Sequence, residues 1–249
     1  MEKPILKVEN LSKIYHTAKA EVIAVSNFTY EFVKGNFIAI VGPSGCGKST
    51  ILNILANLDS ASNGKIKFED NIKIGYMLQQ DALFDWLTVM DNCLLGLKLQ
   101  KNLNEQTKEY VVNLLNTYGL GDFINSYPHV LSGGMRQRVA LIRTLATKPD
   151  LIFMDEPFSA LDYQTRLSVS DDVYNIIKKE NKTAIMVTHD IAEAISMADE
   201  VIILSKRPST IKKIIKIELT DKSNSINNRK AKEFSEYYNT IWMEIEHNV

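Results

Sequence analysis

Eight consecutive residues of this chain have the types and spacing of a phosphate-binding loop. They fit the pattern G-x-x-x-x-G-K-[ST] and read Gly42-Pro43-Ser44-Gly45-Cys46-Gly47-Lys48-Ser49. Glycines let the backbone curl so that successive N–H groups point at one phosphate. Lys48 can reach the β- and γ-phosphates, the Ser49 hydroxyl can ligate Mg²⁺, and the Thr50 hydroxyl lies near the α-phosphate. The pattern predicts a site for a nucleoside triphosphate.

A chance glycine loop is the alternative, and the flanking residues disfavour it. Phe37–Val41 is a short apolar run, typical of a buried strand. After the loop, Ile51, Leu52 and Leu55 recur at helical spacing. A helix that begins here adds its positive N-terminal dipole to the phosphate site.

Two adjacent acids follow a second apolar run. Residues 151–154 read as a buried strand, and Asp155 and Glu156 come directly after it. Ligands of open α/β sheets bind at the carboxyl ends of the strands. There Asp155 can hold Mg²⁺ through water and Glu156 can polarise an attacking water. An ordinary acidic turn is the alternative, and the phosphate loop favours the catalytic interpretation.

Two further short motifs point to the same chemistry. Leu131-Ser132-Gly133-Gly134-Met135 opens a predicted helix, and such a helix start is either a simple cap or a second anion site. Its position between the phosphate loop and Asp155 favours the second. His189 follows an apolar strand within Thr188-His189-Asp190. We interpret it as functional, and the other three histidines as surface or structural residues.

Composition restricts the class of protein that holds these motifs. The chain has 249 residues, 29 basic and 30 acidic residues, a net charge of −1 and a mean hydropathy of −0.12. These values are typical of a soluble globular protein and disfavour a nucleic-acid-coating one. No apolar run approaches the ~20 residues that span a membrane, and the N-terminus lacks the apolar core of a signal peptide. The two cysteines, Cys46 and Cys93, are far apart, which disfavours a disulfide scaffold and favours a reducing compartment.

The predicted elements that must position the motifs alternate between strand and helix. N-terminal strands are expected over residues 5–8, 22–25 and 28–32, and later strands over 151–154, 184–187 and 201–204. Helices are expected over 165–179 and 191–198, and the middle of the chain, from about residue 89 to 148, is expected to be helical, with Asn104 as a helix cap. This alternation predicts an α/β fold with a mostly parallel sheet. A short strand near residues 211–217 and a last helix over 230–246 complete the prediction.

Taken together, the motifs resemble those of the ATP-binding cassette (ABC) family. The family's LSGGQ signature is LSGGM here, with Met135 at the place of glutamine. Gln79 matches the family's Q-loop, Ser159-Ala160-Leu161-Asp162 its D-loop, His189 its switch histidine and Tyr15 the aromatic residue that stacks on adenine. On its own, Tyr15 at a strand end is ordinary packing. The resemblance covers about residues 5–205, with its motifs in register.

The resemblance implies a fold, a domain organisation and roles for the motifs. The fold is a P-loop NTPase: a RecA-like mixed-sheet core over 1–87 and 149–205, an inserted helical subdomain over about 88–148 and an N-terminal antiparallel β region. Residues 206–249 form a C-terminal extension. Glu156 is the implied catalytic base, His189 contacts the γ-phosphate, and Gln79 senses Mg²⁺ and the attacking water. Ser49, Gln79 and Asp155 are the implied magnesium ligands, with ATP as the nucleotide.

The resemblance also implies partners. Two cassettes, identical or related, would pair head to tail, so that Ser132, Gly133, Gly134 and Met135 of one subunit cover the ATP of the other. Within the family, the chain looks most like the nitrate, sulfonate and taurine import ATPases, because residues 79–92, 157–166 and 205–208 match that group. Asp85, Ser209 and Thr210 depart from it, and residues 64–74 look short. The expected partners are membrane permeases and, indirectly, an extracytoplasmic solute-binding protein, with no nucleic acid. The expected place is the cytoplasmic face of the membrane.

Three other functions remain open from the sequence. A non-transport ABC ATPase of DNA repair or translation would usually show a coiled-coil insertion, two fused cassettes or basic character, and none is visible. A small-molecule P-loop kinase would lack the second glycine loop and the Thr-His-Asp motif. An exporter cassette is disfavoured by the stretch that follows Gln79.

Three further features each have two interpretations. The apolar residues 83–87 are expected to be an exposed docking site for a permease helix, with simple core packing as the alternative. The basic residues between 206 and 216 indicate a solvated edge strand, with a lipid-facing surface as the alternative. Cys46 is expected to be a small neutral filler, with an exposed, reactive thiol as the alternative.

Overall fold

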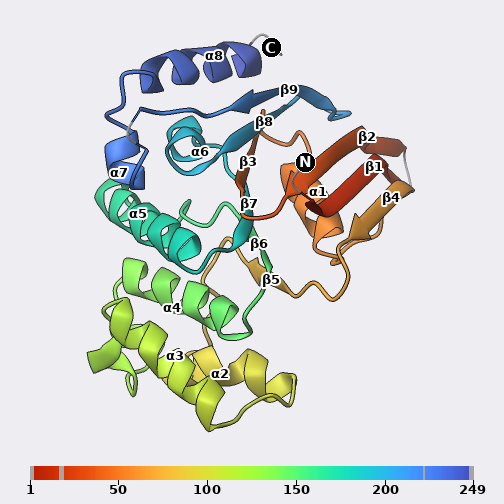
Figure 1. The fold of residues 1–249 in the computed structure, drawn as a ribbon. Helices are drawn as coiled ribbons and strands as arrows, with labels where there is room; N and C mark the ends of the chain where they lie inside the picture. The colour runs from red at the N-terminus through yellow and green to blue at the C-terminus, as the bar shows by residue number, and fades with distance from the viewer. Residues whose placement is uncertain (1–2, 17–19, 221, 247–249) are drawn as a thin grey trace.

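A computed structural model describes residues 3–16, 20–220 and 222–246 of the chain, and its centre is a six-stranded sheet. The strands follow the order β5 (Ile74–Met77), β6 (Leu151–Asp155), β7 (Thr183–Val187), β3 (Phe37–Val41), β8 (Glu200–Leu204) and β9 (Ile211–Lys216). The first five are parallel to one another and β9 is antiparallel to β8. Figure 1 shows this sheet running through the middle of the molecule. The predicted mostly parallel sheet is confirmed.

Strand β3 lies in the interior of the sheet and is buried on both faces. Phe37, Ala39 and Val41 point into the core shared with the helices, while Ile38 and Ile40 point into the core beneath the N-terminal strands. This is why its sequence is a continuous apolar run without alternation. The carboxyl end of this buried strand leads directly into the phosphate loop, so the loop starts from a fixed position.

Three antiparallel strands form a second sheet at the N-terminus, in the order β2 (Glu21–Val33), β1 (Pro4–His16) and β4 (Asn63–Phe68). The separate strands expected over 22–25 and 28–32 are wrong, because both runs belong to β2. Asn27 has a positive φ of 54° and lies at a shift in the register between β1 and β2, which does not end the strand. Strand β4 is not among the strands predicted from the sequence, since it is mostly exposed and contains no apolar run.

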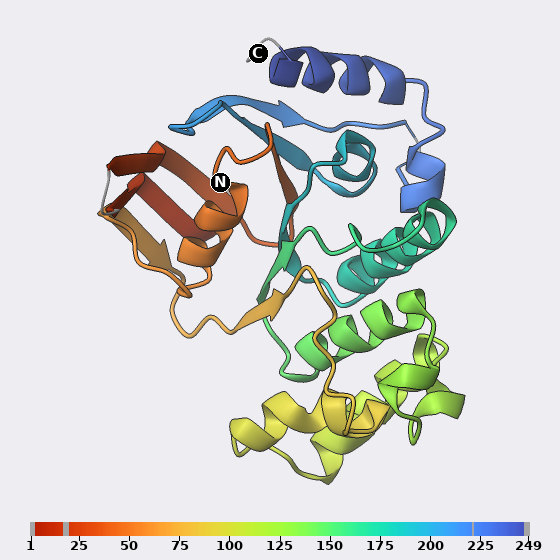
Figure 2. The same cartoon turned by 180° about the vertical axis from the view of Figure 1, so that it is seen from behind.

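The helical middle of the chain projects from the sheet beside β5 (Figure 2). It consists of α2 (Val89–Leu99), α3 (Glu105–Thr117) and α4 (Gly133–Ala146), with two short 3₁₀ turns before α4. Asn104 caps α3 through its side chain, as predicted, in a reciprocal capping box with Thr107. Helix α4 lies between α2 and α3 on one side and α5 (Tyr163–Lys179) on the other. The domain boundaries implied by the resemblance remain a prediction.

The C-terminal part adds β9 as an edge strand of the sheet and continues with α7 (Ser225–Asn228) and α8 (Phe234–Glu246). The last helix starts at Phe234, not at residue 230, because turns occupy 229–233 and the Glu233 carboxylate accepts hydrogen bonds from Thr220. On β9, Lys212 and Lys213 form ion pairs with Glu244 of α8 at 3.1 and 2.8 Å. These lysines thus lie on an edge strand of the sheet, as the edge-strand interpretation predicts.

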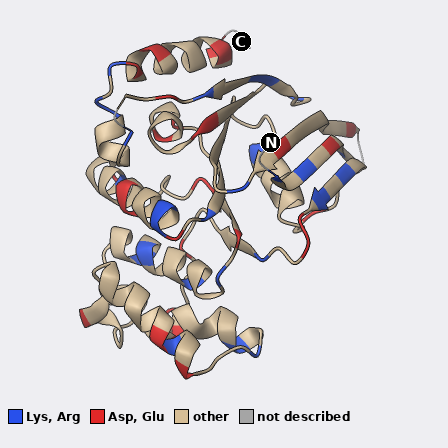
Figure 3. Cartoon of the chain, viewed as in Figure 1, with Lys and Arg blue, Asp and Glu red and all other residues tan. Residues whose placement is uncertain are grey.

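Residues of both charge signs occur over the whole molecule, but individual elements differ in their charge. Figure 3 shows basic and acidic residues together on α5, whereas β9 carries only basic residues and α8 only acidic ones. In the described ranges, no helix combines the length and apolar character needed to cross a membrane.

Candidate functional site

The phosphate loop, residues 42–49, connects β3 to α1 (Lys48–Leu55) and curls at two glycines. Gly45 and Gly47 have φ angles of +70° and +116°, conformations that side-chain-bearing residues rarely adopt. The Lys48 ammonium is nearly buried, and it donates hydrogen bonds to the carbonyls of Gly42 at 2.9 Å and Pro43 at 3.1 Å. The carbonyls of the loop therefore hold the lysine on the concave side of the loop, where a phosphate chain would bind.

The end of β6 brings the first of the two acids to this loop. The Ser49 hydroxyl donates to the Asp155 carboxylate over 3.0 Å. Burial and the neighbouring Glu156 charge raise the pKa of Asp155, while the Ser49 hydrogen bond opposes the shift. A hydroxyl and a carboxylate are hard oxygen ligands that fit Mg²⁺, which usually binds one or two carboxylates together with substrate phosphates. In the described part of the chain, no group of three or more His, Cys, Asp or Glu side chains is placed to hold a metal ion by itself.

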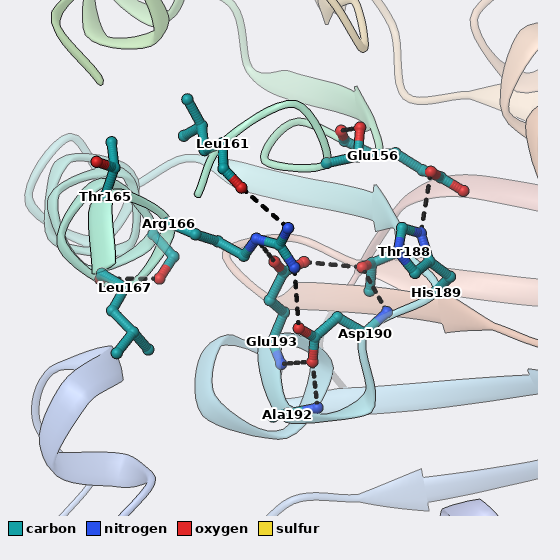
Figure 4. Close-up of polar contacts among 12 residues, drawn as sticks. Glu156, Leu161, Thr165, Arg166, Leu167, Thr188, His189, Asp190, Ala192 and Glu193 are labelled. Carbon is teal, nitrogen blue, oxygen red and sulfur yellow. Dashed lines mark hydrogen bonds and ion pairs between the residues drawn. The ribbon is translucent and has the colours of Figure 1, made fainter. Parts of the chain in front are cut away.

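Glu156 and His189 come together although they leave different strands. The Nδ1 atom of His189 lies 3.0 Å from Oε2 of Glu156 (Figure 4). Glu156 has a strained backbone with φ of +44°, and its N–H donates to the carbonyl of Val187, the residue at the end of β7. From this backbone position the Glu156 carboxylate points toward the histidine (Figure 4). Because a carboxylate only accepts, Nδ1 carries the hydrogen in this contact.

A network behind His189 ties the strand end to the D-loop (Figure 4). Arg166 of α5 donates to the Leu161 carbonyl at 3.0 Å and lies 3.6 Å from the Asp190 carboxylate and 3.9 Å from the Glu193 carboxylate. Glu193, on α6 (Ile191–Met197), accepts a hydrogen bond from Thr188 at 2.8 Å. Burial, with the Asp190 charge, raises the pKa of Glu193 to about 7. Arg166 and Glu193 are not among the site residues predicted from the sequence.

A cavity of about 520 Å³ opens over the phosphate loop. Its lining comprises Ser44, Gly45, Gly47, Lys48, Ser49, Thr50, Glu156, His189 and Arg207. The structure thus brings together most of the predicted phosphate-loop residues, Glu156 and His189. Arg207 is the addition, because the sequence places it among the basic residues of the C-terminal part and in the stretch 205–208 that matches the import ATPases, but not among the predicted site residues. The sequence feature that could have indicated Arg207 is its position shortly after a strand, because ligands bind at the carboxyl ends of the strands.

Gln79 and Tyr15 lie outside this lining, as far as the described residues define it. The Gln79 amide donates to the Ser159 hydroxyl of the D-loop at 3.2 Å, and Ser159 donates to the Glu156 carbonyl at 3.0 Å. Gln79 thus reaches the acidic pair through the D-loop. The Tyr15 ring is partly exposed, with its hydroxyl 3.2 Å from the Asp59 carboxylate. A role in stacking adenine remains a prediction.

The signature loop, residues 131–135, lies apart from the cavity. Ser132 caps α4 by accepting from the N–H of Met135 at 3.3 Å. A Cβ at Gly133 would stand 3.2 Å from Leu161 of the D-loop, and one at Gly134 would stand 2.9 Å from Val169 of α5. The signature loop therefore packs against the D-loop and α5. Its contact with the nucleotide of a second subunit remains a prediction.

Residues 83–87 were expected to be an exposed apolar stretch, but only part of the stretch is exposed. Leu83 is buried and Leu87 is half-buried. Phe84 and Trp86 are exposed, Trp86 by 73%, and their ring centroids lie 4.9 Å apart. The buried Asn92 amide holds the turn between them by donating to the carbonyls of Phe84 and Leu87. The exposed surface is therefore a pair of aromatic rings on a fixed turn.

Cys46 is 2% exposed, as the filler interpretation expects, and burial raises the pKa of its thiol. The reactive-thiol alternative required exposure and is wrong. Both cysteines are free and buried.

Comparison with known proteins gives a consistent picture. The ABC transporter family model matches residues 25–159. The chain is 45% identical to the uncharacterized ABC transporter ATP-binding protein YtlC of Bacillus subtilis, over 96% of this chain and 95% of the relative. It is 40% identical to the taurine import ATP-binding protein TauB of Pelagibacter ubique, over 82% and 80% of the two chains. The structure is similar to a dimeric ATP-binding cassette in a post-hydrolysis state bound to ADP and Pi, with a TM-score of 0.72, 31% identity, and 86% and 99% of the two chains covered.

Proposed function

This chain belongs to the ABC transporter family, and from that premise we propose that it is the ATP-hydrolysing subunit of an importer that takes up a small solute. One observation carries the proposal. One cavity is lined by Lys48 of the phosphate loop, by Ser49 and by the Glu156–His189 pair. Ser49 is hydrogen-bonded to Asp155. Phosphate binding, metal binding and water activation need these three groups in one place.

Hydrolysis needs a positioned water and a site for the charge that develops. Glu156 is the general base, because its carboxylate faces the cavity and its orientation is fixed by His189. Lys48 and the loop N–H groups hold the phosphates, and His189 reaches the γ-phosphate from the β7 side. When bound, Mg²⁺ neutralises phosphate charge, and Ser49 and Asp155 are the residues that would hold it. Most of the catalysis is positioning and charge stabilisation.

We propose that two such chains form the working unit. The signature loop is a helix N-terminus with exposed Ser132 and Gly133, yet it lies outside the chain's own cavity. A helix N-terminus favours anionic ligands. Head-to-tail pairing would set it against the phosphates in the partner's cavity. The similarity to a dimeric cassette bound to ADP and Pi supports this arrangement.

The import function and the solute class rest on the relatives and on one surface feature. The taurine import relative is 40% identical, and this supports a nitrate-, sulfonate- or taurine-like solute. The exposed Phe84 and Trp86 rings are the proposed contact for a permease helix, since exposed aromatic pairs are typical of partner sites. That contact would hold the chain at the cytoplasmic face of the membrane.

The direct test is reconstitution of the chain with the permease and solute-binding protein encoded by neighbouring genes. Mg-ATP hydrolysis in vesicles is measured with taurine, other sulfonates and nitrate, one at a time. We expect one loaded binding protein to stimulate hydrolysis, and Trp86→Ala to remove the stimulation without changing basal activity. Robust hydrolysis that ignores the permease and every solute would overturn the importer proposal and favour a non-transport ATPase.

Glu156→Gln tests the catalytic base. The amide keeps the shape of the side chain but cannot accept a proton, so hydrolysis should fall by about 10²- to 10⁴-fold. ATP binding, measured by equilibrium titration, should be retained, and ATP-bound dimer should accumulate in size-exclusion chromatography. Turnover at the wild-type rate would remove Glu156 from the base role.

A further inference from the structure

The loop that joins β8 to β9, residues 205–210, touches the phosphate loop at two positions. The Arg207 guanidinium donates through Nη2 to the carbonyl of Gly45 over 2.6 Å and also lines the nucleotide cavity. Two residues later, Ser209 packs against the other strained glycine, because a Cβ at Gly47 would lie 3.3 Å from the Ser209 hydroxyl. The β8–β9 loop therefore contacts the phosphate loop at both of its positive-φ glycines.

The β8–β9 loop is itself firmly held. Ser209 is buried, its N–H donates to the Ala24 carbonyl at 3.0 Å, and its own carbonyl accepts from the Ser26 N–H at 2.9 Å. At the other end, the Thr210 N–H donates to the Ser205 hydroxyl at 2.9 Å. Strand β2 and the loop's internal contacts thus fix the backbone of the loop that carries Arg207.

The bond to Gly45 matches what a phosphate-binding loop requires. When the N–H groups of such a loop turn inward to a phosphate, its carbonyls turn outward and need their own partners. Arg207 satisfies the Gly45 carbonyl with one of its five donors. Its full positive charge then stands at the rim of a cavity that also holds Lys48.

We propose that Arg207 is a further positioning residue of the nucleotide site. It keeps the phosphate loop in its phosphate-binding conformation through the Gly45 carbonyl, and its charge attracts the triphosphate. Arg207 acts on ATP affinity, whereas Glu156 and His189 act on the chemical step. The inference rests on the proposed ATPase function and extends the site to a residue of the C-terminal part.

The test compares three substitutions at one position with a matched neighbour. Arg207→Ala removes the charge and the donors, Arg207→Gln keeps donors without charge, and Arg207→Lys keeps the charge. Lys206→Gln removes the same net charge from an exposed side chain that does not line the cavity. Equilibrium Kd values for ATP and ADP, the KM and kcat of Mg-ATP hydrolysis, and Tm are measured for each.

We expect Arg207→Ala to weaken ATP binding about tenfold, the loss typical of a charge-assisted hydrogen bond. The loss should be smaller for Arg207→Gln, smallest for Arg207→Lys, and greater for ATP than for ADP. KM should rise while kcat stays within about threefold, and Lys206→Gln should match the wild type. Unchanged ATP affinity in Arg207→Ala, or a lowered Tm as the sole effect, would overturn the inference. Failure of the proposed ATPase activity, on which the inference rests, is a separate result, since wild-type protein would then not hydrolyse ATP.

Discussion

The phosphate loop and the signature loop both begin a helix with glycines, and they use glycine for different physical reasons. In the phosphate loop, Gly45 and Gly47 adopt positive φ angles that bend the backbone around a phosphate. In the signature loop, neither glycine has a positive φ; Gly134 is there because a Cβ would collide with Val169. One loop needs glycine for backbone conformation, and the other needs it for close packing. The two loops should therefore respond to the same alanine substitution in different ways.

The largest expected effect comes from Gly47→Ala. Alanine cannot adopt a φ of +116° without strain, and its Cβ would approach the Ala24 carbonyl at 3.2 Å. We expect ATP affinity to fall by about 100-fold, which is within the usual cost of such strain. Titration with ATP measures it. Gly119→Ala is the control, because Gly119 also has a positive φ, of +72°, but lies at the end of α3. An affinity loss of equal size in both variants would break the comparison.

A smaller effect is expected from Gly134→Ala in the signature loop. The added methyl group would stand 2.9 Å from Val169, and overpacking of this kind costs about 1–3 kcal/mol. For a domain of this size, Tm should fall by about 2–12 °C. ATP affinity of the single chain should stay unchanged. Gly133→Ala is the matched control, since its Cβ would meet the flexible end of Leu161 at 3.2 Å. A Tm drop in Gly133→Ala as large as in Gly134→Ala would contradict the packing argument.

The smallest effect is a pH dependence of stability that comes from Glu193, in the network between the end of β7 and the D-loop. Its pKa is raised from 4.5 to about 7, so the folded state holds a proton that the unfolded state releases. Stability is therefore greatest below pH 4.5 for this group and declines as pH rises toward 7. The full loss is about 3 kcal/mol at most.

Denaturant unfolding of Glu193→Gln against wild type isolates this contribution. The two proteins should have similar stability at pH 5, and the variant should be the more stable at pH 8, because glutamine stays neutral. Glu236→Gln, at an exposed carboxylate of α8, should follow the wild type at both pH values. A stability difference that does not change between pH 5 and 8 would remove Glu193 as its source.

The sequence anticipated those parts of the site that are continuous in the chain. The phosphate loop between β3 and α1, the acids after β6 and the Ser132 cap of α4 each follow from local pattern. The fold class followed in the same way, from apolar runs alternating with helical spacing. Strand β5 was missed because its four residues are too few for a pattern.

Contacts between distant residues could not be predicted in this way. Arg207 reaches Gly45 from a loop whose Ser209 is hydrogen-bonded to β2, and nothing near Arg207 in the sequence indicates that pairing. Gln79 bonds to Ser159 and not directly to Asp155, a matter of how two loops pack. Residues 83–87 are less exposed than expected because the Leu83 side chain packs into the core. An apolar residue type alone does not show whether its side chain points into the core or into solvent.

The place of β3 in the sheet has a consequence for how the protein is made. Phe37 of β3 pairs with Ala184, and Ile38 pairs with Glu200, so both neighbours of the strand that leads into the phosphate loop are synthesised in the last third of the chain. A nascent chain that has emerged as far as α5 contains the whole loop but lacks both flanking strands. Such distant pairings form slowly. We therefore expect ATP to bind and stabilise the chain only at the end of translation, so that nucleotide selects finished subunits over incomplete ones.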